Sequence, residues 1–206
     1  MQYLVFREQL KNFRVFSVSD IRKIDPKFYP ARLNDWQKMG YIKKLRRGYY
    51  IFTDTVSNED ELFLIANHLY APSYVSFESA LSYYGFIPEG VYSITSVCSK
   101  KTSSFQTPIA LFTYHRLKSQ LLFGYRLERL GNQSFKIAEM EKAVLDYLYL
   151  NPKIAKEADF HEWRFNSREF LERANMDKLR RYSKAFASKS LLARLDQIIV
   201  FMNKVK

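Results

Sequence analysis

The segment MGYIKKLRRGYYIF (residues 39–52) limits what this chain can fold into more than any other. Within it, four cationic side chains lie in five consecutive positions: Lys43, Lys44, Arg46 and Arg47. A glycine and two tyrosines follow directly. Glycine reaches the positive-φ conformations of tight turns at low steric cost. We therefore expect a β-hairpin in which residues 46–48 form a cationic turn and residues 49–52 form an aromatic return strand.

Two short helical patterns begin the chain. Residues 2–13 read as an amphipathic helix with apolar side chains at Leu4, Val5, Leu10 and Phe13. Ser17 or Ser19 can cap a second helix, and Asp20 stands in a capping-box position relative to Ser17. Ile21 and Ile24 are expected to face inward from it, and the turn at Asp25-Pro26-Lys27 should end it.

A third helix is expected directly before the hairpin, over residues 29–39. Pro30 suits its first turn, because a proline there loses no helical hydrogen bond. Leu33 and Trp36 lie three residues apart and give it a core face. Gly40 suits the position just after the helix, where a positive φ is common.

Helix, short helix, turn, helix and basic hairpin follow one another in the order of a winged helix-turn-helix. In such domains the last helix enters the major groove of DNA, and hairpin cations reach the phosphates beside it. The predicted DNA-contacting residues are Arg22, Lys23, Lys27, Tyr29, Arg32, Asn34, Lys38, Lys43, Lys44, Arg46 and Arg47. Arg32 is favoured for a bidentate guanine contact. Strand alternation indicates that the four hairpin cations cannot all face the DNA. A basic, solvated hairpin without a function is the alternative.

The distribution of charge supports a polyanionic partner. The chain has 33 Lys+Arg and 21 Asp+Glu residues, a net charge of +12. Residues 1–54 carry +7, residues 55–152 carry −1 and residues 153–206 carry +6.

The single cysteine, Cys98, fits a reducing cytoplasm. Arg7 interrupts the N-terminal apolar stretch too early for a signal peptide, and no apolar run is long enough to span a membrane.

Residues 55–152 indicate a mixed α+β domain. One helix should begin at Ser57 as its cap and bury Leu62, Phe63, Ala66, Leu69 and Tyr70. A second, capped by Ser76 and ended by Gly85, should bury Phe77, Ala80, Leu81 and Tyr84. Strands are expected over residues 91–99, 109–117, 121–130 and 134–138. A third helix, ended at Asn151-Pro152, should bury Met140, Ala143, Val144, Tyr147 and Leu148.

Residues 153–206 read as a basic helical tail. One helix is expected to begin around Phe165, Phe170 and Leu171. A C-terminal helix carries an apolar stripe at Leu191, Leu192, Leu195, Ile198, Ile199 and Met202. A possible second basic surface consists of Arg180, Arg181, Lys184, Lys189 and Arg194. Either this surface binds a polyanion such as extended DNA, or it is the solvated face of a helical bundle. The expected fold class is α+β, with a winged helix-turn-helix at 1–54 and an α+β domain at 55–206.

Four segments together resemble the AbiEi antitoxins of bacterial type IV (abortive infection) toxin–antitoxin systems. They are SVSDIRKI, ARLNDWQKMGYIKKLRRGYYIF, SYVSFESALSYYGFIPEGVYSITSV and IAEMEKAVLDYLYLNP, and the resemblance covers roughly residues 15–152. The resemblance implies a transcriptional autorepressor that binds its own promoter at inverted repeats. It also implies a neighbouring nucleotidyltransferase toxin, which such antitoxins oppose without a stable complex. Residues 153–206 match no such segment. We expect residues 1–54 to have a role separate from that of the remaining chain.

The sequence offers little for catalysis. His68, His115 and His161 are widely spaced, without the clustering of a metal site. No phosphate-binding glycine loop or nucleophile motif occurs. Paired acids such as Glu139 and Glu141 stand at helix starts, where the helix dipole accounts for them. We expect no enzyme, metal or cofactor. The alternative function is a protein-interaction module that binds a partner through the neutral middle domain.

Overall fold

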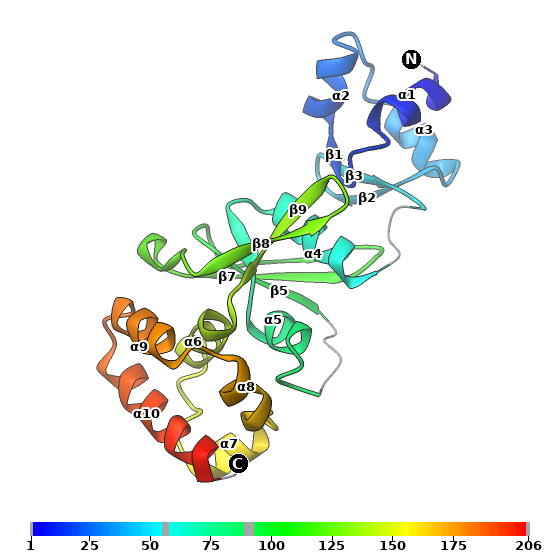
Figure 1. The fold of residues 1–206 in the computed structure, drawn as a ribbon. Helices are drawn as coiled ribbons and strands as arrows, with labels where there is room; N and C mark the ends of the chain where they lie inside the picture. The colour runs from blue at the N-terminus through cyan, green and yellow to red at the C-terminus, as the bar shows by residue number, and fades with distance from the viewer. Residues whose placement is uncertain (1, 55–57, 89–92, 205–206) are drawn as a thin grey trace.

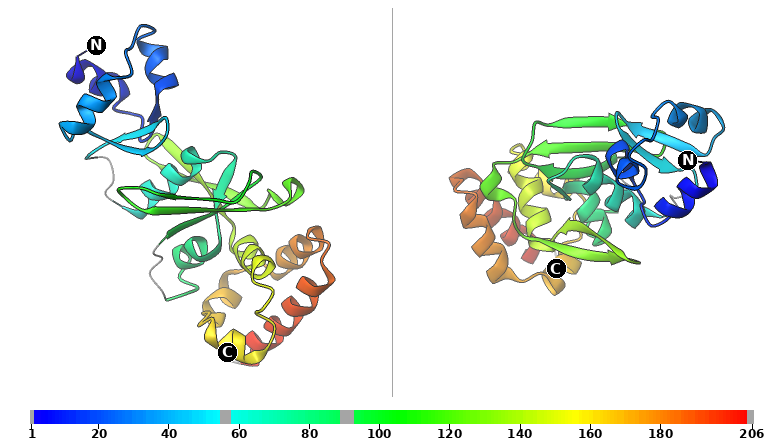
Figure 2. Two further views of the ribbon diagram at one scale, coloured as in Figure 1. Left: turned by 180° about the vertical axis from the view of Figure 1, so that it is seen from behind. Right: turned by 90° about the horizontal axis from the view of Figure 1, so that it is seen from above.

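A computed structural model describes residues 2–54, 58–88 and 93–204 of the chain (Figure 1). The fold is mixed α+β, as the sequence predicts. A small N-terminal unit and a group of C-terminal helices lie at opposite ends of a central mixed sheet, and the views in Figure 2 agree on this arrangement. Among the described residues, no helix combines the length and apolar character needed to cross a membrane.

The N-terminal unit has three helices and a three-stranded sheet. Its elements are α1 (Tyr3–Leu10), β1 (Phe16–Ser17), α2 (Val18–Ile24), α3 (Arg32–Lys38), β2 (Ile42–Arg46) and β3 (Tyr49–Phe52). The strands are antiparallel in the order β1-β3-β2. The predicted hairpin is therefore present, and its turn is Arg47-Gly48 rather than residues 46–48, because Arg46 still pairs with Tyr49. Gly48 has a φ of +84°, the conformation for which glycine was expected there.

An aromatic core holds this unit together. The rings of Phe6 and Trp36 lie 4.4 Å apart, and Phe52 packs edge-on against Phe6 at 5.5 Å. The buried cluster comprises Phe6, Leu10, Phe16, Ile21, Phe28, Leu33, Trp36, Ile42, Tyr50 and Phe52. The predicted apolar face of α1 was wrong in part, because Leu4, Val5 and Phe13 are exposed. Phe6 and Leu10 are four residues apart and form the buried face instead.

Local sequence signals fix the ends of α2 and α3. The Ser17 hydroxyl accepts from the Asp20 N–H at 3.2 Å, and the Ser17 N–H donates to the Asp20 carboxylate at 3.0 Å. This is the predicted capping box. After α3, the Gly40 N–H donates to the Gln37 carbonyl and the Tyr41 N–H to the Trp36 carbonyl, the predicted glycine-terminated end. Pro30 precedes α3, which begins at Arg32, so the predicted start at residue 29 was three residues too early.

The central sheet has six strands in the order β6-β7-β5-β4-β9-β8. They are β4 (Ser73–Val75), β5 (Ser93–Cys98), β6 (Ser103–Gln106), β7 (Leu111–Arg116), β8 (Tyr125–Leu130) and β9 (Gln133–Ala138). The four predicted strands correspond to β5, β7, β8 and β9, although residues 91 and 92 lie outside the described residues. The sequence did not predict β4 or β6. The pairs β5–β7 and β4–β9 are parallel, and the others are antiparallel.

Helices cover both faces of this sheet. The Tyr114 hydroxyl on β7 donates to the Ala66 carbonyl of α4 (Glu59–Leu69), whereas the Tyr74 hydroxyl on β4 reaches α6 (Met140–Leu150). α5 (Phe77–Tyr83) packs beside α6 on that second face (Figure 1). The predicted cap Ser57 lies outside the described residues, and Asn58 caps α4. Ser76 stands at the cap position of α5, but its hydroxyl donates to Asp146 instead.

Four helices form the C-terminal end. They are α7 (Glu157–Glu162), α8 (Ser167–Arg173), α9 (Met176–Ala185) and α10 (Lys189–Lys204). The predicted stripe of α10 is largely confirmed, with Phe201 added to it, while Leu192 and Ile199 are only partly buried. Phe165 precedes α8 rather than beginning it.

Arg194 is buried, which contradicts its predicted place on a basic surface. Its Nη1 donates to the carbonyls of Leu148, Asn151 and Ile154 at 2.9, 3.1 and 3.2 Å.

Replacing Arg194 with methionine should lower the free energy of unfolding by about 2 kcal/mol. The variant removes the donor that satisfies three buried or half-buried carbonyls at the end of α6. Urea denaturation followed by circular dichroism measures the change. Lys189→Met at the exposed start of α10 is the matched control and should leave the midpoint unchanged. Equal midpoints for both variants would contradict this role for Arg194.

Candidate nucleic-acid interface

Helix α2 and the connection after it expose four of the predicted contact residues. Arg22 and Lys23 point outward from α2, and Lys23 forms an ion pair of 3.1 Å with Asp20 in the preceding turn of the helix. Lys27 and Tyr29 lie in the connection to α3, not on the helix, and the Tyr29 residue is 71% exposed. The Asp25 carboxylate accepts from the Lys27 N–H at 3.1 Å, which fixes the turn predicted at these residues.

Helix α3 turns one face to the core and the other to solvent. Leu33 and Trp36 are buried, whereas Arg32, Asn34 and Lys38 are exposed. Arg32 is the first residue of the helix, the end from which side chains contact base edges in helix-turn-helix docking. α3 therefore exposes a guanidinium, a carboxamide and an ammonium group, of which Asn34 and Lys38 are four residues apart and share one side of the helix. These are groups that can bond to the edges of guanine and adenine in a major groove.

The hairpin exposes only two of its four cations. Lys44 and Arg47 are exposed, while Lys43 and Arg46 are half-buried. An irregularity between Lys44 and Arg46 interrupts the strand pairing. As a result Leu45 is buried against the central domain and Arg46 lies on the same side.

Arg46 binds within the protein at the junction with the central domain. Its guanidinium carbon lies 4.7 Å from the Phe105 ring centroid, 5.0 Å from that of Tyr49 and 5.7 Å from that of Tyr70. Cation–π attraction of this kind strengthens as the cation loses water. Arg46 was predicted to contact phosphate, but this position makes it a residue that fixes the hairpin to the central domain. The exposed cations of the hairpin are then Lys44 and Arg47.

The N-terminal unit shares a continuous apolar contact with the central domain. Val15, Leu45 and Ile51 are buried in the same cluster as the core of the central sheet. Arg14 and the nearly buried Glu61 form an ion pair of 3.0 Å across this junction. A cut at the predicted boundary between residues 54 and 55 would expose Leu45 and Ile51 to water.

The predicted second basic surface keeps four of its five members. Arg180, Arg181 and Lys184 are exposed on α9, opposite the buried Leu179 and Ser183, and Lys189 is exposed at the start of α10. Arg194 is excluded because it is buried. These helices lie at the end of the molecule farthest from the N-terminal unit (Figures 1 and 2). The four residues therefore do not extend the surface formed by α2, α3 and the hairpin.

Neither protein-family models nor curated proteins give a match to this chain. The resemblance to the AbiEi antitoxins thus rests on its four segments, and the structure shows what some of their residues do. Tyr74 and Ser76 from the third segment contact Lys142 and Asp146 from the fourth. Lys142 and Asp146 form a fully buried ion pair on α6. Polar residues that stand out in these segments are therefore part of the protein core.

Sequence reasoning missed this buried network. A lysine and an aspartate four residues apart on a helix ordinarily indicate a solvent-exposed pair. Burial lowers the pKa of Lys142 and raises the pKa of Asp146, and the attraction between the two groups opposes both shifts. The only sequence signal was the run AVLDYLYL around Asp146, in which the helix has apolar residues on nearly all sides.

The candidate catalytic residues lie apart from one another. Burial lowers the pKa of both His68 and His115, so these side chains add no charge to the basic surfaces at neutral pH. His161 packs edge-on against Phe201 at 4.7 Å. Cys98 is buried in β5, and burial raises the pKa of its thiol. Within the described residues, no three His, Cys, Asp or Glu side chains are grouped as metal ligands would be.

Proposed function

We propose that the N-terminal unit binds double-stranded DNA as a winged helix-turn-helix and that the chain represses its own promoter. The observation that carries this proposal is the set of exposed cations around α2, α3 and the hairpin turn. Its members are Arg22, Lys23, Lys27, Arg32, Lys38, Lys44 and Arg47. The order of elements and the paired hairpin support the same reading.

The two parts of this surface have different tasks. Helix α3 enters the major groove, where Arg32 and Asn34 read base edges. Lys44 and Arg47 contact phosphates beside that groove and hold the register of the protein on the duplex without reading sequence. The aromatic core and the junction through Arg46 keep the helix and the hairpin in a fixed relation, which specific binding requires.

The antitoxin role is a proposal supported by the resemblance alone. In this proposal the chain opposes a nucleotidyltransferase toxin encoded beside it, and no stable complex with the toxin is assumed. We expect some variants of the full chain to lose repression and keep toxin antagonism. The reason is that the third and fourth segments of the resemblance, which begin at residue 73, lie outside the DNA-binding unit.

The test of this function is a promoter-reporter assay in cells that express the full chain. The wild-type protein should lower reporter output from its own promoter. The variant Lys44→Gln with Arg47→Gln should restore output toward the level without protein, because it removes phosphate contacts and leaves the core intact. The same variant should still protect cells from the neighbouring toxin, at least in part. Reporter output that is insensitive to the wild-type chain would contradict the proposal.

The alternative, a protein-interaction module, has its best support at β8. This strand ends the sheet order, and Leu127 is 62% exposed on it, next to the exposed Tyr125. An exposed edge strand with apolar side chains can pair with a strand of another protein. Loss of a partner upon Leu127→Lys, with promoter repression unchanged, would favour this second function.

A further inference from the structure

The central domain has a strongly uneven charge distribution despite its net charge of −1. No aspartate or glutamate occurs from residue 90 to residue 127. The same stretch carries Lys100 and Lys101 after β5, and Arg116 and Lys118 at the end of β7. Because β5 and β7 are parallel neighbours, these ends meet at one edge of the sheet. All four side chains are exposed, and none pairs with a carboxylate of the described residues.

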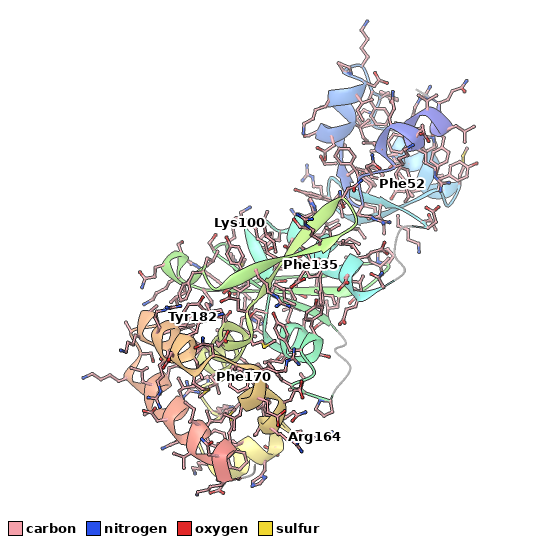
Figure 3. All side chains as sticks on the ribbon, viewed as in Figure 1. Phe52, Lys100, Phe135, Arg164, Phe170 and Tyr182 are labelled. Atoms are coloured by element: carbon pink, nitrogen blue, oxygen red, sulfur yellow. The ribbon has the colours of Figure 1, made fainter. Side chains whose placement is uncertain are left out.

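This basic edge adjoins the hairpin of the N-terminal unit. The Lys100 Nζ lies 5.4 Å from the centroid of the Tyr70 ring, and the Arg46 guanidinium lies 5.7 Å from the same centroid. The Tyr70 hydroxyl donates to the Lys101 carbonyl at 3.0 Å. Figure 3 shows Lys100 on the side of the central sheet that faces the N-terminal unit, and Arg164 at the other end of the molecule. The hairpin that carries the exposed Arg47 and the segment that carries the exposed Lys101 therefore meet at Tyr70.

The contacts within the basic edge hold its members together. The Arg116 N–H donates to the Thr102 hydroxyl at 3.1 Å, and the Leu117 N–H donates to the Cys98 carbonyl at 2.9 Å. Lys100 and Arg116 both lower the pKa of Cys98 against the effect of burial, which agrees with their closeness to one another. Exposed hydroxyl-bearing residues, Thr102 and Ser104, follow the two lysines.

We propose that Lys100, Lys101, Arg116 and Lys118 extend the hairpin surface and bind the phosphate backbone of the DNA held by the N-terminal unit. The proposal rests on the proposed function and adds a contact from the central domain. Lysine, arginine and hydroxyl side chains are the usual phosphate partners in such complexes. Large exposed apolar side chains, which a protein partner would need, are not found among the described residues 93–121.

The experiment is the salt dependence of binding of the full chain to its own promoter duplex. For B-DNA, log Kobs falls with log salt by about 0.9 per phosphate neutralised. Lys100→Gln with Lys101→Gln should therefore reduce the slope by about two units and leave the preference for promoter over scrambled DNA unchanged. The control Lys153→Gln with Lys204→Gln removes the same charge from two exposed positions beside α7, at the far end of the molecule, and should keep the wild-type slope.

The outcomes separate this inference from the proposed function. If the wild-type chain binds promoter DNA specifically and the Lys100 and Lys101 variant keeps its slope, the extension is wrong and the proposed function stands. If the wild-type chain shows no preference for the promoter, the proposed function is wrong, and the inference that rests on it is wrong as well. A wild-type preference for single-stranded RNA of the same sequence, lost in the variant, would overturn the assignment of duplex DNA to this surface.

Discussion

Replacing Lys142 with methionine is expected to lower the free energy of unfolding by about 3–5 kcal/mol. Lys142 and Asp146 are fully buried and form an ion pair one turn apart on α6. The Tyr74 and Ser76 hydroxyls donate to the same Asp146 oxygen at 2.9 and 2.8 Å, and the Lys142 ammonium donates to the Tyr74 oxygen at 2.8 Å. Without Lys142, the Asp146 carboxylate has no opposite charge, and a buried unpaired charge is costly.

The ammonium group of Lys142 also connects distant parts of the chain. It lies 5.4 Å from the ring centroid of Tyr74, 5.2 Å from that of Phe123 and 5.0 Å from that of Phe186. These rings come from β4, from the segment before β8 and from the end of α9. Removal of the Lys142 ammonium group should therefore destabilise the sheet and the C-terminal helices together, so that they unfold in one cooperative transition.

Urea denaturation measures the free energy of unfolding of the Lys142 variant, and a double variant tests the cause of the change. Lys142→Met with Asp146→Leu should be less destabilised than the sum of the two single variants, since no charge is then left unpaired. The matched control is Arg168→Met, which breaks an exposed pair with Glu172 of the same spacing and should leave the midpoint unchanged. A wild-type midpoint for Lys142→Met would show that the pair contributes nothing to stability.

Replacing Arg32 with alanine is expected to weaken binding to the promoter by about 1–3 kcal/mol, or roughly 5- to 150-fold. The residue is exposed at the first position of α3, where a bidentate contact with guanine is possible. A base contact differs from a phosphate contact in a measurable way. Arg32→Ala should relax the sequence preference at one position, whereas Arg47→Gln should weaken promoter and scrambled duplexes to the same extent.

Binding to a set of promoter duplexes with single base changes measures the effect of Arg32→Ala. Lys153→Gln, beside α7 at the other end of the molecule, is the control for a simple change of net charge. Wild-type affinity and an unchanged base preference in the Arg32 variant would exclude this residue from base recognition, without bearing on the hairpin.

The N-terminal unit could be predicted from the sequence because its signals are local. Each signal determines the structure of residues only a few positions away along the chain. The signals are the capping box of Ser17 with Asp20, the helix end at Gly40 and the turn at Gly48. Arg32 is exposed on α3, but strand alternation alone did not tell which of the four hairpin cations would be exposed, and these are Lys44 and Arg47. Where the prediction failed in this unit, as at Leu4 and Val5, the periodicity was too short to choose between two faces of one helix.

Features that depend on distant parts of the chain could not be predicted. β4 has three residues, and its place at the centre of the sheet comes from pairing with β5 and β9, not from its own sequence. Arg46, Lys142 and Arg194 all read as solvent-exposed cations. Each is instead held by partners far along the chain: aromatic rings, a buried hydroxyl network or the carbonyls at the end of a helix.

The most direct test of the central claim is the affinity of the full chain for a duplex of its own upstream sequence, measured by fluorescence anisotropy. A scrambled duplex of the same length and composition is the comparison, at about 50 and 200 mM salt. The account predicts at least roughly 10³-fold tighter binding to the upstream duplex at the higher salt, with affinity for both duplexes falling as salt rises. Equal affinity for the two duplexes at both salt concentrations would contradict sequence-specific DNA binding by the N-terminal unit.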